Sequence, residues 1–299
     1  MLSKTHALDT FFCKKLLIEM VYTLSESILD IERFKKVFPE GYVPESNLAA
    51  IKCIYSLLEK THQNEFYFKN TIFNHFVTDK NIKDCTYPSI QNEMPVAASI
   101  TDLIVTEKGK PSEVLEIKSE CDSFDRLASQ LPDYYKMFRK VSLVTGEKLF
   151  NKAKERFNDS SLGLYVIDKN GTLYQEREPV ECYDLLNKRE IFRSLRKPEY
   201  TAILNQHYDK LPSFKDSPET YYSDLCKLFE ALDIQTIIKH VDEAMSQRFY
   251  RVKDLIKIPK ELRSIYYFGT LTRIERVRVL KTSMLTAGLR FLSTTASTS

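Results

Sequence analysis

The 299-residue sequence lacks the features that mark several classes of protein. It has no run of about 18 consecutive apolar residues, and charged side chains interrupt its N-terminal segment, so we expect neither a membrane span nor a secretion signal. Its six cysteines are scattered, without a Cys-x-x-Cys pair or a nearby His-x-x-x-His, which argues against a zinc site and a disulfide framework. We therefore expect reduced thiols in a cytoplasmic protein.

The sequence also lacks a strong excess of one charge and the motifs of several classes of enzyme. Lys and Arg number 44 against 41 Asp and Glu, so the overall charge neither requires nor excludes a polyanionic partner, and any nucleic-acid signal must be local. No local motif supports Ser-His-Asp or Cys-His catalysis. The histidines show no ligand spacing, and we expect each to be structural. They are His6, His62, His75, His207 and His240.

The first part of the chain has helical periodicity. Apolar residues recur every three or four positions from Leu8 to Phe38, which predicts an amphipathic helical pair. After a break at Pro39 to Pro44, Ser46 is placed to cap another helix, and a further helix is expected to begin near Asn64.

Between Glu93 and Val144 the pattern changes to short, β-branched runs. Ser99–Thr106 and Glu113–Lys118, separated by a turn around Gly109, predict a hairpin. The remaining expected elements are a helix over 123–140, a strand over 141–144, a helix over 148–157, a strand over 163–168, and a final hairpin turning at Asn170-Gly171. This order indicates an α/β fold, with a mixed sheet flanked by helices.

Three consecutive regions follow from these patterns. We predict an N-terminal helical region over 1–61, an α/β core over 62–178 and a C-terminal helical region over 179–299, with helix notably from Pro218 to Met245.

A carboxylate and an ammonium group share one face of the second strand, because Glu116 and Lys118 are two residues apart. A hairpin folded about Gly109 pairs residues whose numbers sum to about 218, which sets Asp102 opposite Glu116. Two opposed carboxylates repel each other, and a bound cation, the neighbouring Lys118 or a raised pKa could offset this repulsion; a hard dication with oxygen ligands, Mg²⁺ or Mn²⁺, does so best.

The Asp102 and Glu116-Ile117-Lys118 pattern resembles the signature of the PD-(D/E)XK nuclease superfamily, although Thr101 stands where the motif has proline. The resemblance covers about residues 62–178, and the stretch from Glu116 to Thr145 is similar to an uncharacterised bacterial branch often met beside mobile elements. It implies a restriction-endonuclease-like core of order α-β-β-β-α-β.

The resemblance also implies roles for individual residues. Asp102 and Glu116 would bind the metal, helped by the carbonyl of Ile117, while Lys118 would position or activate the attacking water. Glu65, in the helix before the sheet, would add a ligand, and the following helix contributes a catalytic Gln130. In that helix we also assign nucleic-acid contacts to Arg126 and Tyr134.

Each assignment has a plainer alternative. Glu116 and Lys118 could form an exposed cross-strand ion pair, and Glu65 could pair with Lys69 on its own helix. Gln130 could face solvent, and Tyr134 could be an ordinary packing residue.

The segment from Arg248 to Lys281 is the most basic, and aromatic residues are interleaved with its charges. Arg273, Arg276 and Arg278 could therefore grip a phosphate backbone, with the aromatic rings stacking on bases. The alternative is a solvated helical face with core aromatic residues.

These observations together predict a Mg²⁺- or Mn²⁺-dependent nuclease, acting on DNA by family resemblance, in defence or mobile-element biology. RNA cleavage is a further option. The rival is a non-catalytic protein that keeps the fold and binds nucleic acid or a partner. The helical flanks could recognise, dimerise or bind a regulatory protein.

Overall fold

The computed structural model describes residues 8, 11–12, 37–42, 44, 46–119, 122–158, 160–248, 254–269 and 271–284, except for the side chains of 273 and 280–284. Contacts divide the chain into two compact units. We call residues 75–251 the sheet unit, and residues 1–74 with 252–299 the helical unit. This division differs from the three consecutive regions predicted above, because the two ends of the chain contribute to the same unit.

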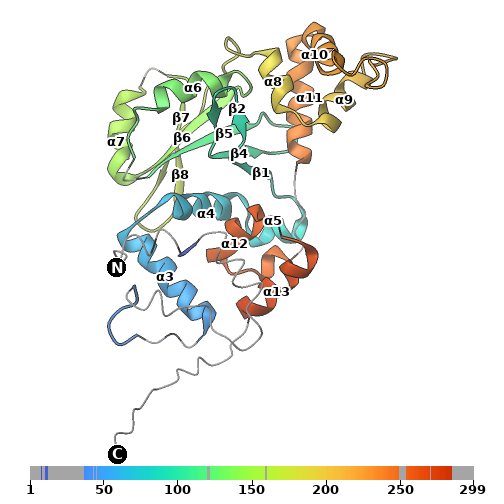
Figure 1. The fold of residues 1–299 in the computed structure, drawn as a ribbon. Coiled ribbons are helices and arrows are strands. Elements are labelled where there is room, and N and C mark those ends of the chain that lie inside the picture. The colour runs from blue at the N-terminus through green and yellow to red at the C-terminus, as the bar shows by residue number, and fades with distance from the viewer. Residues whose placement is uncertain are drawn as a thin grey trace, which may run out of the picture. The chain divides into compact units, whose positions relative to one another are not determined.

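A mixed sheet with strand order β1-β4-β5-β6-β7-β8 forms the centre of the sheet unit (Figure 1). Its strands are β1 (Ser89–Asn92), β4 (Leu103–Thr106), β5 (Glu113–Lys118), β6 (Lys140–Gly146), β7 (Gly163–Ile167) and β8 (Leu173–Arg177). β5, β6 and β7 run parallel, whereas the other neighbours are antiparallel. The predicted mixed α/β architecture is confirmed at this level.

Two crossover helices follow from the parallel strands, because parallel neighbours cannot be joined by a tight hairpin. α6 (Leu127–Tyr135) connects β5 to β6, and α7 (Glu147–Arg156) connects β6 to β7. The helix predicted over 123–140 is shorter in the structure. The helix ends at Tyr135. Met137 and Phe138 then lie in the core, and β6 begins at Lys140.

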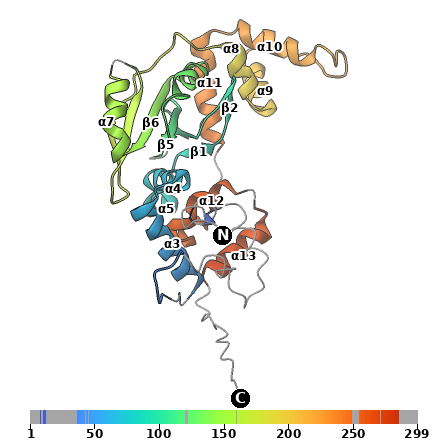
Figure 2. The same cartoon turned by 60° about the vertical axis from the view of Figure 1, so that its left-hand side comes forward.

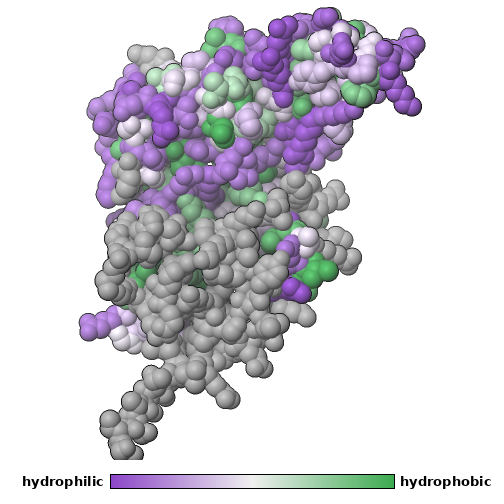
Figure 3. Space-filling view, viewed as in Figure 1, coloured by the Kyte–Doolittle hydropathy of each residue, from purple (hydrophilic) through white to green (hydrophobic). Residues whose placement is uncertain are grey.

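The other helices of the sheet unit gather beside the β1 side of the sheet, opposite to α7, in both views (Figures 1 and 2). They are α8 (Lys188–Ser194), α9 (Lys197–Asn205), α10 (Tyr221–Ala231) and α11 (Ile234–Gln247), while the short α5 (Asp79–Asp84) precedes β1. α11 packs against β1 and β4, and one continuous apolar core joins these helices to the sheet. The face drawn in Figure 3 is mainly hydrophilic over this unit, with hydrophobic side chains in small separate areas.

The strand predicted over Ser99–Thr106 is broken in the structure. Ser99–Ile100 forms β3, which pairs with β2 (Pro95–Val96) in a separate small hairpin, and β4 begins only at Leu103. The backbone N–H of Thr101 donates to the Met94 carbonyl at 3.0 Å instead of joining the main ladder. The break leaves Asp102 at a bend between the two hairpins.

The helical unit contains α3 (Asn47–Thr61), most of α4 (Glu65–Phe76), the short 3-10 turns η2 (Leu255–Lys257) and η3 (Lys260–Leu262), α12 (Arg263–Phe268) and α13 (Arg273–Met284). The predicted cap is confirmed, since the Ser46 hydroxyl accepts from the Ala49 N–H at 3.1 Å. The helical segment predicted over 8–38 and the tail beyond 284 lie mostly outside the described residues.

Asn70 of α4 links the two ends of the chain within the helical unit. Its buried amide donates to the Lys260 carbonyl at 2.9 Å, and its side-chain oxygen accepts from the Ser264 N–H at 3.1 Å. These bonds bridge more than 185 residues of sequence. None of the helices among the described residues is long and apolar enough to cross a bilayer.

Candidate functional site

The predicted strand register places Asp102 beside the Glu-x-Lys motif. Leu103 pairs with Leu115 and Val105 with Glu113, so the numbers sum to 218, as expected from a turn at Gly109. One carboxylate oxygen of Asp102 accepts a hydrogen bond from the Ile117 N–H at 2.7 Å. Because the N–H and carbonyl of a strand residue point to the same side, the Ile117 carbonyl also faces the edge at Asp102.

Glu116 is buried with only 1% of its side chain exposed, and both of its oxygens have partners. Its Oε1 contacts the Lys118 Nζ at 2.7 Å, and its Oε2 accepts from the Tyr134 hydroxyl at 2.7 Å. The Lys118 side chain is 12% exposed, so this ion pair is not the exposed cross-strand pair of the plainer interpretation. A buried carboxylate must be compensated by charge and hydrogen bonds, and here it has both.

Tyr134 of α6 positions the Glu116 carboxylate and does not contact solvent. Its side chain is fully buried. Its hydroxyl lies 2.8 Å from the Ile100 carbonyl oxygen and 2.7 Å from the Glu116 Oε2. Burial and the neighbouring carboxylates of Glu116, Asp102 and Asp133 raise its pKa far above the ordinary value, so the phenol stays protonated and can donate. The sequence assigned Tyr134 to a nucleic-acid contact, whereas the structure places it behind the acidic pair.

Two polar atoms around this network have no hydrogen-bond partner in the described structure. Gln130 donates its amide N–H to the Tyr134 hydroxyl at 3.2 Å, but its Oε1 is buried and unpartnered. The buried hydroxyl of Thr145, which pairs with Lys118 in the β5–β6 ladder, is also unpartnered. Paired residues project to the same face of a sheet, so the side chains of Thr145 and Lys118 lie on one face. Sequence reasoning did not select Thr145, although the parallel register was the signal that could have identified it.

The arrangement offers hard oxygen ligands with a cation beside them. Asp102 and Glu116 supply carboxylates and Ile117 a carbonyl, which is the donor type that Mg²⁺ and Mn²⁺ prefer. Within the described part of the chain, no group of three or more His, Cys, Asp or Glu side chains is placed to hold a metal ion. Since Mg²⁺ commonly takes only one or two protein carboxylates, this donor set and the unpartnered Gln130 oxygen fit such an ion.

Glu65 begins α4 in the helical unit, separately from this network. Its side chain is 62% exposed and pairs with Lys69 at 2.7 Å, which is the pairing that the alternative interpretation expected. Its role as a metal ligand stays a prediction.

The predicted nucleic-acid-binding arginines lie in different surroundings. Arg126 is exposed at the start of α6 in the sheet unit. Arg276 and Arg278 belong to α13 of the helical unit, where Arg278 is exposed and Arg276 lies over the Tyr266 ring, 5.2 Å from its centre. The side chain of Arg273 lies outside the described residues.

The aromatic residues that the structure describes in this basic stretch are mostly core residues, whereas those at 249 and 250 lie outside the described residues. Tyr266 is 0% and Tyr267 2% exposed, and Phe73 of α4 packs against both Tyr267 and Phe268. The structure therefore supports the alternative interpretation for them, because buried rings cannot stack on bases.

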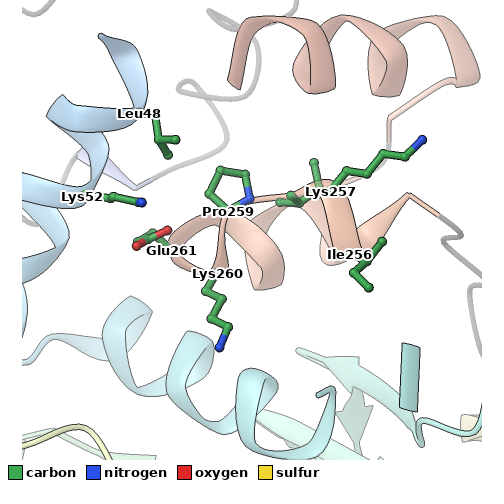
Figure 4. Close-up of a pocket in the computed structure, with 8 residues that line it drawn as sticks. Leu48, Lys52, Ile256, Lys257, Pro259, Lys260 and Glu261 are labelled. Carbon is green, nitrogen blue, oxygen red and sulfur yellow. The ribbon is translucent and has the colours of Figure 1, made fainter. Parts of the chain in front are cut away.

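A pocket of about 490 Å³ opens in the helical unit between α3 and the η2–η3 segment (Figure 4). Three of its lining side chains are lysines, yet Lys257 and Lys260 point away in different directions and Lys52 points toward Glu261. Ammonium groups that diverge do not form a cradle for a phosphate, so we do not place the functional site here.

Comparison with known proteins identifies a matching family. The family model of bacteriophage P4 protein cII matches residues 59–262, about two thirds of the chain. No curated protein matched, and no solved structure matched.

Proposed function

This chain belongs to the bacteriophage P4 protein cII family, and we propose that it hydrolyses phosphodiester bonds in nucleic acid, DNA above all, using Mg²⁺ or Mn²⁺. A phage family agrees with a mobile-element or defence setting, but its name says nothing of the chemistry. The proposal therefore depends on the site.

The main support for nuclease activity is that Asp102 lies beside the strand that holds Glu116, Ile117 and Lys118. Asp102 lies outside the regular ladder and bonds the Ile117 N–H at 2.7 Å, while Glu116 is buried between Lys118 and Tyr134. A carboxylate that is merely structural would be cheaper to leave exposed, because burying a charge costs free energy even when it is paired.

The topology supports a restriction-endonuclease-like core. A helix precedes β1, β4 and β5, in which β4 is antiparallel to both of its neighbours, and α6 then leads to β6 parallel to β5. This order is the α-β-β-β-α-β core that the resemblance implies, and β1, absent from the sequence prediction, completes it.

In the proposed reaction a water oxygen bonds to phosphorus as the bond to the leaving oxygen breaks, giving a phosphomonoester and a hydroxyl end. Bound at Asp102, Glu116 and the Ile117 carbonyl, Mg²⁺ or Mn²⁺ would stabilise phosphoryl charge and make water more acidic. Lys118 stabilises the extra negative charge on the phosphoryl oxygens. Tyr134 and the Ile117 N–H hold the two carboxylates in place, and the Gln130 oxygen can accept a hydrogen bond from the water.

The test is cleavage of supercoiled plasmid, single-stranded DNA and RNA with Mg²⁺ or Mn²⁺. Wild type is compared with Glu116→Ala, Lys118→Ala and the control Glu176→Ala, an exposed glutamate of the edge strand β8. We expect metal-dependent cutting that the first two changes abolish and the control retains, on samples matched for folding by circular dichroism.

The alternative is a non-catalytic protein that keeps the fold and binds nucleic acid or a partner. It is favoured by the complete pairing of Glu116 inside the protein. Two results together would favour this alternative. No substrate would be cut, and calorimetry would give the same Mn²⁺ binding for wild type and Glu116→Ala.

A further inference from the structure

Two histidines from different parts of the chain meet in the sheet unit. His207 follows the end of α9, and His240 lies in α11, 33 residues later. Their Nε2 atoms are 3.2 Å apart, and their ring centres are 5.3 Å apart with the planes inclined by 75°. Sequence spacing gave no reason to pair them.

The distance between the two nitrogens suits a shared metal ion. Zinc binds imidazole nitrogens at about 2.0–2.1 Å in tetrahedral geometry, which places two such nitrogens about 3.3 Å apart. Both rings present the same atom, Nε2, toward the other. A direct hydrogen bond would require one of these nitrogens to carry a proton, whereas a metal would use both lone pairs.

The surroundings of His240 disfavour the protonated form of its ring. Burial of His240, followed by the proximity of His207, lowers the His240 pKa, and Lys239 acts in the same direction while Glu243 opposes them. His207 is exposed, which leaves the pair accessible to an ion from solution.

We propose that His207 and His240 form a binding site for a borderline dication of the Zn²⁺ class, separate from the oxygen site at Asp102 and Glu116. Imidazole nitrogen suits Zn²⁺, Ni²⁺ and Cu²⁺, whereas carboxylate oxygen suits Mg²⁺ and Mn²⁺. Water would complete the coordination, since the described residues hold no larger group of metal-binding side chains. The bound ion would tie the end of α9 to α11. This proposal does not depend on nuclease activity.

The experiment is Zn²⁺ titration of the metal-stripped full chain by calorimetry. It is carried out in an Asp102→Ala/Glu116→Ala background, so that binding at the oxygen site does not contribute. His207→Ala and His240→Gln are each added to this background, and His62→Ala serves as the histidine control. We expect one Zn²⁺ ion to bind per chain. Its affinity should fall in either pair variant by at least ~10–100-fold, which is the loss caused by mutating residues that only hydrogen-bond to a metal ligand. The affinity should be unchanged in the control.

A second measurement needs no variant. Nitrogen chemical shifts of the imidazoles in the wild-type chain should show Zn²⁺ coordination through Nε2 at two of the five histidines. Binding that is equally strong without His207 and His240, or no Zn²⁺-dependent shift at any Nε2, would overturn the proposal and leave the pair as a hydrogen bond between side chains.

Discussion

Two glutamate–lysine pairs in this protein have the same nitrogen–oxygen distance, 2.7 Å, but their carboxylates lie in opposite surroundings. Glu65 is 62% exposed beside Lys69 on one helix, whereas Glu116 is 1% exposed beside Lys118 on a central strand. The first pair needs no special explanation, because a helical i,i+4 pair forms readily at a surface. The second gains little net stability, because desolvation offsets the attraction, so its presence indicates a role other than stability.

The largest effect should come from removing the cation of the buried pair. Lys118→Met leaves Glu116 buried without a positive charge, and we expect the free energy of unfolding to fall by about 3–5 kcal/mol in metal-free buffer. Urea denaturation measures it. If the acidic pair binds a dication, Mn²⁺ should restore part of the loss. If the unfolding free energy falls by less than about 1 kcal/mol, the Glu116–Lys118 pair would not differ in its effect on stability from the Glu65–Lys69 pair.

The next effect tests the hydrogen bond behind the buried carboxylate. Tyr134→Phe leaves a buried Glu116 oxygen without its donor, which should cost about 1–3 kcal/mol of unfolding free energy. Tyr174→Phe, at a half-exposed position of β8, is the matched control and should change stability by less than about 0.5 kcal/mol. Equal effects in the two variants would show that the Tyr134 hydroxyl does not hold Glu116.

A third carboxylate, that of the partly buried Glu113, sharpens the comparison, because burial has the largest effect on its pKa. Burial raises the pKa of Glu113 despite a hydrogen bond from Ser142 at 2.6 Å. A raised folded-state pKa means that its contribution to stability is present at acid pH and is lost as pH rises through that value. We expect Glu113→Gln to stabilise the protein at pH 7 and to flatten this part of the profile, measured by urea denaturation from pH 4 to 8. The difference in unfolding free energy between the variant and wild type should be more favourable to the variant at pH 7 than at pH 4. The opposite order would contradict this prediction.

The smallest effect belongs to the exposed pair. Glu65→Gln should cost no more than about 0.5 kcal/mol, and 1 M NaCl should abolish the difference, because salt screens exposed charges. Stability measured at low and high salt checks this, and a salt-insensitive loss would show that Glu65 has a further role, such as the ligand role predicted for it.

Local chemistry accounts for most of what the sequence predicted correctly. The Ser46 cap, the turn at Gly109 with φ +78° and the Asn170-Gly171 hairpin depend on residues that are neighbours in the chain. Strand alternation and the turn position together fix which residues face one another, so the approach of Asp102 to the Glu116 strand was predictable.

Only the tertiary structure decided the partners brought from far away. The Glu116 oxygens are shared with Tyr134 from the next helix, Asn70 joins the two ends of the chain, and His207 meets His240. Such contacts depend on which elements pack against one another, and the periodicity of a segment shows that it has a packed face but not which partner covers that face. The break before Asp102 is a local feature that the sequence prediction missed, since the backbone of Thr101 bonds to Met94 and the main ladder begins only at Leu103.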